Sequence, residues 1–269
     1  CALPISEPAL LEKWSAEFAA AKKAGKRLPA KPAPPSDRQL RGACTLYNGM
    51  IAPLQPYAIR GAIWYQGEAN AGRALEYRRL FPTMIDGWRN AWGQGAFPFL
   101  FVQLAPNKGL TPTLREAQLY TALTHPNTAM AVTTDVGNPN DIHPKQKEPV
   151  GARLALAARA LAYGEKIEYS GPLFEKLTLD GTNAIVSFTH ATNGLEARHG
   201  ELKGFTIAGA DTNFVPATAR IAGNQVIVTG VKNPVAVRYG WAAAPEVNLY
   251  NTEGLPASPF RSDAPAEVR

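Results

Sequence analysis

Between Ala58 and Tyr163 the sequence alternates three times between a short apolar run and a longer stretch with helical spacing of its apolar residues. The runs predict strands and the stretches predict helices. The strands are expected at Ala58–Tyr65, Phe97–Leu104 and Thr128–Asp135, the first of them buried, and the helices at Ala74–Trp92, Leu114–Leu123 and Gln146–Tyr163. We expect an interruption of the first helix near Pro82. This alternation is typical of an α/β domain, a parallel sheet covered by helices on both faces.

Beyond Tyr163 the segments become shorter and turn residues separate them. The strand-like segments are Phe174–Leu179, Ala184–His190, Leu202–Ile207, Ala217–Ile221, Val226–Val228 and Val235–Arg238. The dipeptides Asp180-Gly181 and Gly223-Asn224 favour hairpin turns between them. We therefore expect a small antiparallel β-domain after the parallel sheet.

The chain begins with a helix, predicted from Pro8 to Arg27, and a proline-rich connector that follows it. Four prolines in the connector favour a stiff, extended chain. The predicted organisation has three parts. Residues 1–45 are the helix and connector, 46–165 are the C-terminal part of the α/β domain, and 166–269 are the β-domain.

Composition argues against several classes of protein. The net charge is +6, but the densest basic run lies beside the prolines without interleaved aromatic residues, so we expect no nucleic-acid partner. No apolar stretch approaches the ~20 residues of a membrane span. The two cysteines, Cys1 and Cys44, provide neither a disulfide framework nor the spacing of a zinc site.

Three loops are expected at the carboxyl ends of the strands, where open α/β sheets bind ligands: Gln66–Arg73, Ala105–Thr113 and Val136–Glu148. In the third loop Asp141 and His143 lie two residues apart, directly after a strand and before a helix. A histidine held at a strand end is well placed to act as a base. The alternative is an Asx turn with a helix cap, and the spacing leaves both interpretations open.

The first loop carries Gln66, Gly67, Glu68 and Asn70. Its glycine permits close approach of a substrate to backbone N–H groups, which could stabilise an oxyanion. A plain turn before a helix explains the same residues. At the start of the next helix, Arg115 is a candidate for substrate binding, although a surface ion pair with Glu116 is the commoner arrangement. Tryptophans are expected in the cores; they are Trp88, Trp92 and Trp241.

Together these segments resemble the sialate O-acetylesterase family, an SGNH-type group of carbohydrate esterases. The matching stretches are Leu46-Tyr-Asn-Gly-Met-Ile-Ala-Pro-Leu, Trp64-Tyr-Gln-Gly-Glu, Trp92-Gly-Gln-Gly with the following Phe-Pro-Phe-Leu-Phe-Val-Gln-Leu-Ala, Leu114-Arg-Glu-Ala-Gln, Asp141-Ile-His-Pro, Arg159-Ala-Leu-Ala-Tyr-Gly, Gly240-Trp-Ala, Asn248-Leu-Tyr-Asn and Gly254-Leu-Pro-Ala-Ser-Pro-Phe-Arg. The resemblance runs from about Pro8 to the C-terminus. It implies an SGNH-hydrolase (flavodoxin-like) α/β fold.

The resemblance also implies hydrolysis of acetyl esters on sugars by a serine nucleophile, with a histidine base and no metal or other cofactor. It assigns the base to His143, its carboxylate to Asp141 and the oxyanion loop to Gln66-Gly67-Glu68. SGNH enzymes usually place the acid three residues before the histidine, whereas here it is two before. Asp135 or a backbone carbonyl is therefore an alternative partner for the histidine. The family further implies a periplasmic or extracellular location.

The nucleophile is the main departure from the family pattern, in which a serine follows the first strand in a Gly-Gln-Ser-Asn type motif. None of the seven serines here lies in such a motif; they are Ser6, Ser15, Ser36, Ser170, Ser187, Ser258 and Ser262. We hypothesise an N-terminally truncated esterase, inactive alone, whose residues 1–6 are a foreign scar. The alternatives are a non-catalytic carbohydrate-binding protein on the esterase scaffold, and one subunit of a processed esterase whose serine lies on a separate chain.

Overall fold

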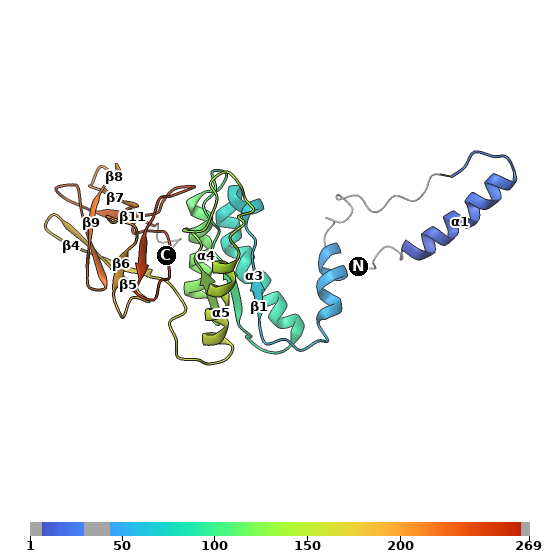
Figure 1. Ribbon diagram of the computed structural model, residues 1–269, viewed down its shortest axis with the longest axis horizontal. Coiled ribbons are helices and arrows are strands. Elements are labelled where there is room, and N and C mark those ends of the chain that lie inside the picture. Colours follow the sequence, from blue (N-terminus) through green and yellow to red (C-terminus); the bar gives the residue numbers. More distant parts are fainter. Residues whose placement is uncertain (1–6, 30–43, 265–269) are drawn as a thin grey trace. The chain divides into compact units, whose positions relative to one another are not determined.

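The computed structural model describes residues 7–29 and 44–264 and divides the chain into two compact units, Cys1–Ala58 and Ile59–Arg269 (Figure 1). The proposed scar at residues 1–6 and most of the proline-rich connector lie outside the described residues. The boundaries that the sequence suggests at residues 45 and 165 stay predictions.

In the first unit, the helix α1 spans Glu7–Lys23 and ends four residues before the predicted end. The end is set by Gly25, which has a φ of +62°. The Gly25 amide donates to the carbonyl of Lys22, and the Lys26 amide donates to that of Ala21. These two bonds form a Schellman motif, which terminates a helix at a left-handed glycine. Two further turns follow, the π-helical η1 (Tyr47–Ile51) and the 3₁₀-helical η2 (Ala52–Leu54).

The second unit opens with the predicted parallel sheet, in the order β1-β2-β3. The strands are β1 (Ala62–Trp64), β2 (Phe99–Val102) and β3 (Thr128–Ala131). In register, Ile63 lies beside Leu100, and Leu100 lies beside Ala129. The fold class inferred from the alternating pattern is therefore confirmed.

Helices cover both faces of this sheet. On one face lie α3 (Ala74–Trp92) and α4 (Pro112–Thr124), whose apolar side chains pack on Phe99 and Phe101. On the other face α5 (Glu148–Leu161) packs Ala157 on Leu100 and Ala129. The short 3₁₀ helix η3 (Glu68–Arg73) joins β1 to α3.

Two expectations about this part are wrong. The helix α3 continues through Pro82 without interruption, because Phe81 and Ile85 on either side of the proline are buried in the core and hold the helix together. The strand β1 is not buried on both faces: the Ile63 side chain is 70% exposed. The strand lies at the edge of the sheet, and α5 packs on β2 and β3 instead.

The predicted antiparallel β-domain follows, next to α4 (Figure 1). One sheet has the order β4-β5-β10-β9, a second has β13-β11-β7-β8, and β12 pairs with β6. The strands are β4 (Leu173–Asp180), β5 (Asn183–Thr189), β6 (Leu195–Ala197), β7 (Phe205–Ala208), β8 (Val215–Pro216), β9 (Thr218–Ala222), β10 (Gln225–Thr229), β11 (Ala236–Tyr239), β12 (Leu249–Asn251) and β13 (Phe260–Arg261). Gly181 and Gly223 have positive φ angles, as the two predicted hairpins require.

Candidate active site

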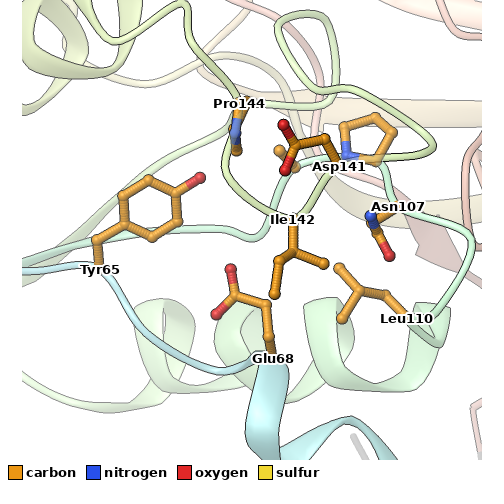
Figure 2. Close-up of a pocket in the computed structure, with 9 residues that line it drawn as sticks. Tyr65, Glu68, Asn107, Leu110, Asp141, Ile142 and Pro144 are labelled. Atoms are coloured by element: carbon orange, nitrogen blue, oxygen red, sulfur yellow. The ribbon is translucent and has the colours of Figure 1, made fainter.

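The three loops that the sequence placed at the carboxyl ends of the strands converge on one small pocket of about 10 Å³, the space of roughly one water molecule. Its lining residues come from all three loops and are Tyr65, Glu68, Ala105, Pro106, Asn107, Leu110, Asp141, Ile142 and Pro144. Figure 2 shows the Glu68 carboxylate rising from the start of η3 toward Ile142 and the ring of Tyr65.

The second and third loops meet closely because residue 137 is a glycine. A Cβ atom at Gly137 would lie 2.3 Å from Cδ of Pro106 and 2.7 Å from its nitrogen. The loops are also joined by the Lys108 amide, which donates to the carbonyl of Pro139 at 2.9 Å. Asp141 and Asn107 therefore line the same pocket.

The Asp141–His143 pair adopts the local turn that spacing had left open. The Asp141 Oδ1 atom accepts a hydrogen bond from the His143 backbone amide at 2.8 Å, which is an Asx turn. The same oxygen lies 3.9 Å from the His143 Nδ1 atom, beyond hydrogen-bond distance. The His143 side chain is 86% exposed and does not line the pocket. Of the proposed pair, the structure brings only Asp141 to the pocket.

Asp135, the alternative acid, is held by other partners. Its two carboxylate oxygens accept bonds from Arg153 Nη1 at 2.7 Å and Arg153 Nη2 at 2.6 Å. The hydroxyl of Tyr250 in the β-domain lies close enough to feel the charge of Asp135. Burial, followed by the charge of Asp135, raises the pKa of Tyr250 to about 12. Asp135 thus anchors the start of the third loop to α5.

The first loop is ordered by one hydrogen bond within it and one from α4. The Gln66 amide Nε2 donates to Oδ1 of Asn70 at 2.9 Å, and the Gln66 carbonyl accepts from Nε2 of Gln118 at 3.3 Å. Gly67 has a φ of 155°, and a Cβ atom there would lie 3.1 Å from the side chain of Leu104. These contacts fix the backbone around Gly67 beside Glu68, which lines the pocket.

Tyr65 closes one side of the pocket. Burial, followed by the nearby negative charge of Glu68, raises the pKa of its hydroxyl. The Nζ atom of Lys147 lies 4.6 Å from the centre of its ring, a cation–π contact. The hydroxyl therefore stays protonated at neutral pH and is available as a hydrogen-bond donor.

Arg115 does not line the pocket and is 1% exposed. Its guanidinium donates to the carbonyls of Leu104 and Ala105 at the end of β2, and to those of Ala242 and Ala243 in the β-domain. Burial lowers its pKa to about 10, which leaves it charged at neutral pH. In this arrangement Arg115 joins the two domains.

The expected surface pair between Arg115 and Glu116 is wrong. Glu116 accepts from Arg261 of the β-domain at 2.7 Å and 2.9 Å instead. The expectation that Trp88 and Trp92 belong to the core is confirmed, since both pack against it. Trp241 is half-buried under the guanidinium of Arg261, 5.0 Å from its ring.

Asn107 was not singled out from the sequence, although its loop was. Its Oδ1 atom accepts a hydrogen bond from the Gly109 backbone amide at 2.8 Å, and its backbone amide donates to the carbonyl of Ala243 at 3.2 Å. Its position as a polar residue shortly after the second strand is the signal that could identify it. Its contact with Ala243, far along the chain, cannot be predicted from local sequence.

Among the described residues, no serine lines the pocket. Ser15 lies in α1. In the β-domain Ser258 is fully buried and its Oγ atom accepts from Nε2 of Gln103 at 2.9 Å. Within residues 7–29 and 44–264, no three His, Cys, Asp or Glu side chains come together as a metal-binding group. In the same part of the chain no helix is long and apolar enough to cross a membrane.

A parallel α/β domain with polar loops at the carboxyl edge, joined to an antiparallel β-domain, defines a class of enzyme-like scaffold that binds small ligands at that edge. Residues 36–160 match the family described as carbohydrate esterase, sialic acid-specific acetylesterase, so this part of the chain belongs to that family.

Known relatives agree with this assignment. The chain is 33% identical to the sialate O-acetylesterase of Mus musculus over 80% of its length, and 32% identical to that of Homo sapiens. A crystal structure of a carbohydrate acetylesterase from Xanthomonas citri is 50% identical, with a TM-score of 0.78 over 81% of this chain. The chain spans about half of these relatives: 46% of the mouse protein, 48% of the human protein and 54% of the Xanthomonas chain.

Proposed function

We propose that this chain carries the histidine loop and the oxyanion loop of a carbohydrate O-acetylesterase that hydrolyses acetyl esters of sugars, sialic acids among them. The observation that carries the proposal is the convergence of Glu68, Asn107 and Asp141, one from each loop, around one pocket at the carboxyl edge of the sheet. Family membership supports the reaction class. No metal or other cofactor is part of the proposal.

In the proposed reaction His143 removes the proton from a serine hydroxyl as it attacks the acetyl carbonyl. Because the imidazole is exposed, the loop must turn His143 toward the pocket for this step. Asp141 then fixes the imidazole tautomer. The Gly67 amide and the Gln66 side chain donate to the oxyanion, each worth about 3–4 kcal/mol in such sites. His143 then gives this proton to the departing sugar oxygen, and water hydrolyses the acetyl-serine that remains, which releases acetate.

We further propose that the serine comes from a polypeptide segment outside these 269 residues. The exposed edge of β1 supports this, because a parallel strand added beside it would end next to Gln66, at the edge where the pocket lies. The segment can belong to the same gene product or to a separate serine-bearing chain. By its family we place the protein in the periplasm or outside the cell.

The test is acetate release from an aryl acetate and from an O-acetylated sialic acid, with this chain alone and with a longer gene product that contains it. We expect no release by the chain alone and release by the longer product. His143→Ala should abolish that release, whereas His199→Ala, in the β-domain, should leave it unchanged. Equal release in the His143→Ala variant would reject the assignment of the base.

The second candidate function is sugar binding without catalysis. It is favoured by the exposed imidazole of His143 and by the pocket's lining, which contains no serine. Saturable binding of the acetylated sugar by the longer gene product, with no acetate released, would establish this function instead.

A further inference from the structure

A second hollow lies at the opposite end of the sheet from the candidate active site. It has a volume of about 390 Å³, within the range of ~300–1,000 Å³ that small-molecule pockets span. It is formed by the last turns of α3, the loop that leads into β2, and Pro126 just before β3. The loops here precede strands, whereas the active-site loops follow them.

The floor of this hollow is held by Arg89, which is 5% exposed. Its Nε and Nη2 atoms donate to the carbonyls of Phe97, Pro126 and Asn127 at 2.9 to 3.1 Å. Asn127 in turn donates to the carbonyl of Ala96 at 2.8 Å. These bonds join the two loops, so the hollow is part of the folded core and does not depend on a loose surface segment.

Two glycines line the hollow. Gly93 and Gly95 have φ angles of +64° and +72°, a conformation that side-chain-bearing residues rarely adopt. A Cβ atom built on either glycine meets nothing within 4 Å. The backbone is therefore bare where a ligand would approach it.

Three side chains offer complementary hydrogen-bonding groups in this hollow. The Asp86 carboxylate is largely exposed and uses Oδ1 to bind Nε2 of His125 at 2.9 Å, so its second oxygen is open to a ligand. The Nη1 atom of Arg89 makes no hydrogen bond to the described residues, and neither does the side chain of Asn90. An acceptor, a charged donor and an amide that does both are thus adjacent.

We propose that this hollow binds an uncharged sugar residue through a pair of neighbouring hydroxyl groups. A hydroxyl both donates and accepts, so one can donate to Asp86 while its neighbour accepts from Arg89, and Asn90 can serve either. The opposite charges of Asp86 and Arg89 offset each other, which favours an uncharged ligand over an ionic one. The choice of sugar as ligand rests on the proposed function, but binding here requires no hydrolysis.

The experiment is an NMR titration of the full chain with a methyl galactoside, with N-acetylneuraminic acid and methylammonium as the anionic and cationic probes. The amides of Gly93 and Gly95 report on this hollow and that of Gly67 reports on the active site. We expect saturable chemical-shift changes at Gly93 and Gly95 with the galactoside, with a Kd in the millimolar range typical of single sugars. Both ions should give weaker changes.

Asp86→Asn and Asn90→Ala change exposed side chains and should each weaken binding, the first at least tenfold. Asp180→Asn, at the exposed end of β4, is the matched control and should leave the affinity unchanged. Absence of saturable shifts at Gly93 and Gly95, an unaltered affinity in Asp86→Asn, or a stronger response to either ion would overturn the proposal. Shifts at Gly67, or a failure to release acetate, bear only on the proposed function.

Discussion

At the scale of single residues, the site depends on glycines whose role comes from distant neighbours. Gly137 resembles an ordinary turn glycine in the sequence, but its lack of a side chain is what allows the third loop to pack on Pro106. The position of a glycine in a turn is predictable from sequence. Its close packing against another loop depends on the assembled sheet.

Gly137→Ala should therefore destabilise the fold by about 1–3 kcal/mol, as overpacking does, and separate the loops that form the pocket. Urea unfolding measures the loss. Gly72→Ala is the matched control, because a Cβ atom there meets nothing within 4 Å. An equal effect of the two substitutions would show that steric contact with Pro106 is not the cause.

The ion pair between Arg153 and Asp135 gives a second prediction at this scale. Both side chains are mostly buried, and Arg153 also donates to the carbonyl of Val132. Arg153→Met leaves the Asp135 carboxylate without its partner, so we expect a loss of about 3–5 kcal/mol in the free energy of unfolding. A double variant with Asp135→Asn should recover part of it. A loss below about 1 kcal/mol would mean that the pair behaves like an exposed one.

Arg115 shows why residue roles were harder to predict than elements. Its position at the start of a helix near the active edge suggested substrate binding. Two of its four carbonyl partners, at Ala242 and Ala243, belong to a loop of the other domain. Local spacing contains no information about that contact. The turn at Asp141, by contrast, is formed with a neighbour two residues away. This Asx turn is one of the two interpretations that the spacing leaves open.

At the scale of elements, periodicity predicts the three strands of the parallel sheet and the three helices that cover it. Each buries a face whose apolar residues recur at regular spacing along the sequence. The strands that escaped prediction are short: β6, β8, β12 and β13 have two or three residues each. Such strands carry no readable alternation and form only through pairing with distant partners.

The exposure of β1 was also beyond prediction, since it depends on where α5 lies across the sheet. An exposed apolar edge strand favours self-association. We expect Ile63→Lys to raise the soluble, monomeric fraction on gel filtration while changing the free energy of unfolding by less than about 0.5 kcal/mol. Leu179→Lys, another exposed apolar position in a strand, is the control and should have less effect. A chain that is already fully monomeric before substitution would contradict the prediction.

At the scale of the whole molecule, the β-domain helps to build the candidate site. The carbonyls of Ala242 and Ala243 accept from Arg115, and the Ala243 carbonyl also accepts from the Asn107 backbone amide. The second active-site loop is thus held from across the domain boundary. The sequence predicts both domains and their order along the chain. It does not predict that the β-domain contacts an active-site loop.

Burial of tyrosines gives the molecule a predictable alkaline limit. Burial raises the pKa of Tyr77, whose hydroxyl bonds to the Gln66 carbonyl, from 10.0 to about 12. Between these values the unfolded chain loses the proton first, so the folded state binds more protons and stability falls as pH rises. The contribution of Tyr77 is complete below about pH 10 and is lost toward about pH 12, by at most ~1.4 kcal/mol per pH unit.

Urea unfolding at a series of pH values up to about pH 11 measures this loss. Tyr77→Phe removes the titrating hydroxyl, so its stability curve should be flatter than that of the unsubstituted chain above about pH 10. Tyr163→Phe changes an exposed ring and should leave the curve parallel to the original. Because each variant is compared with the same chain, other alkaline titrations cancel. Parallel curves for both variants would show that the Tyr77 hydroxyl titrates alike in the folded and unfolded states.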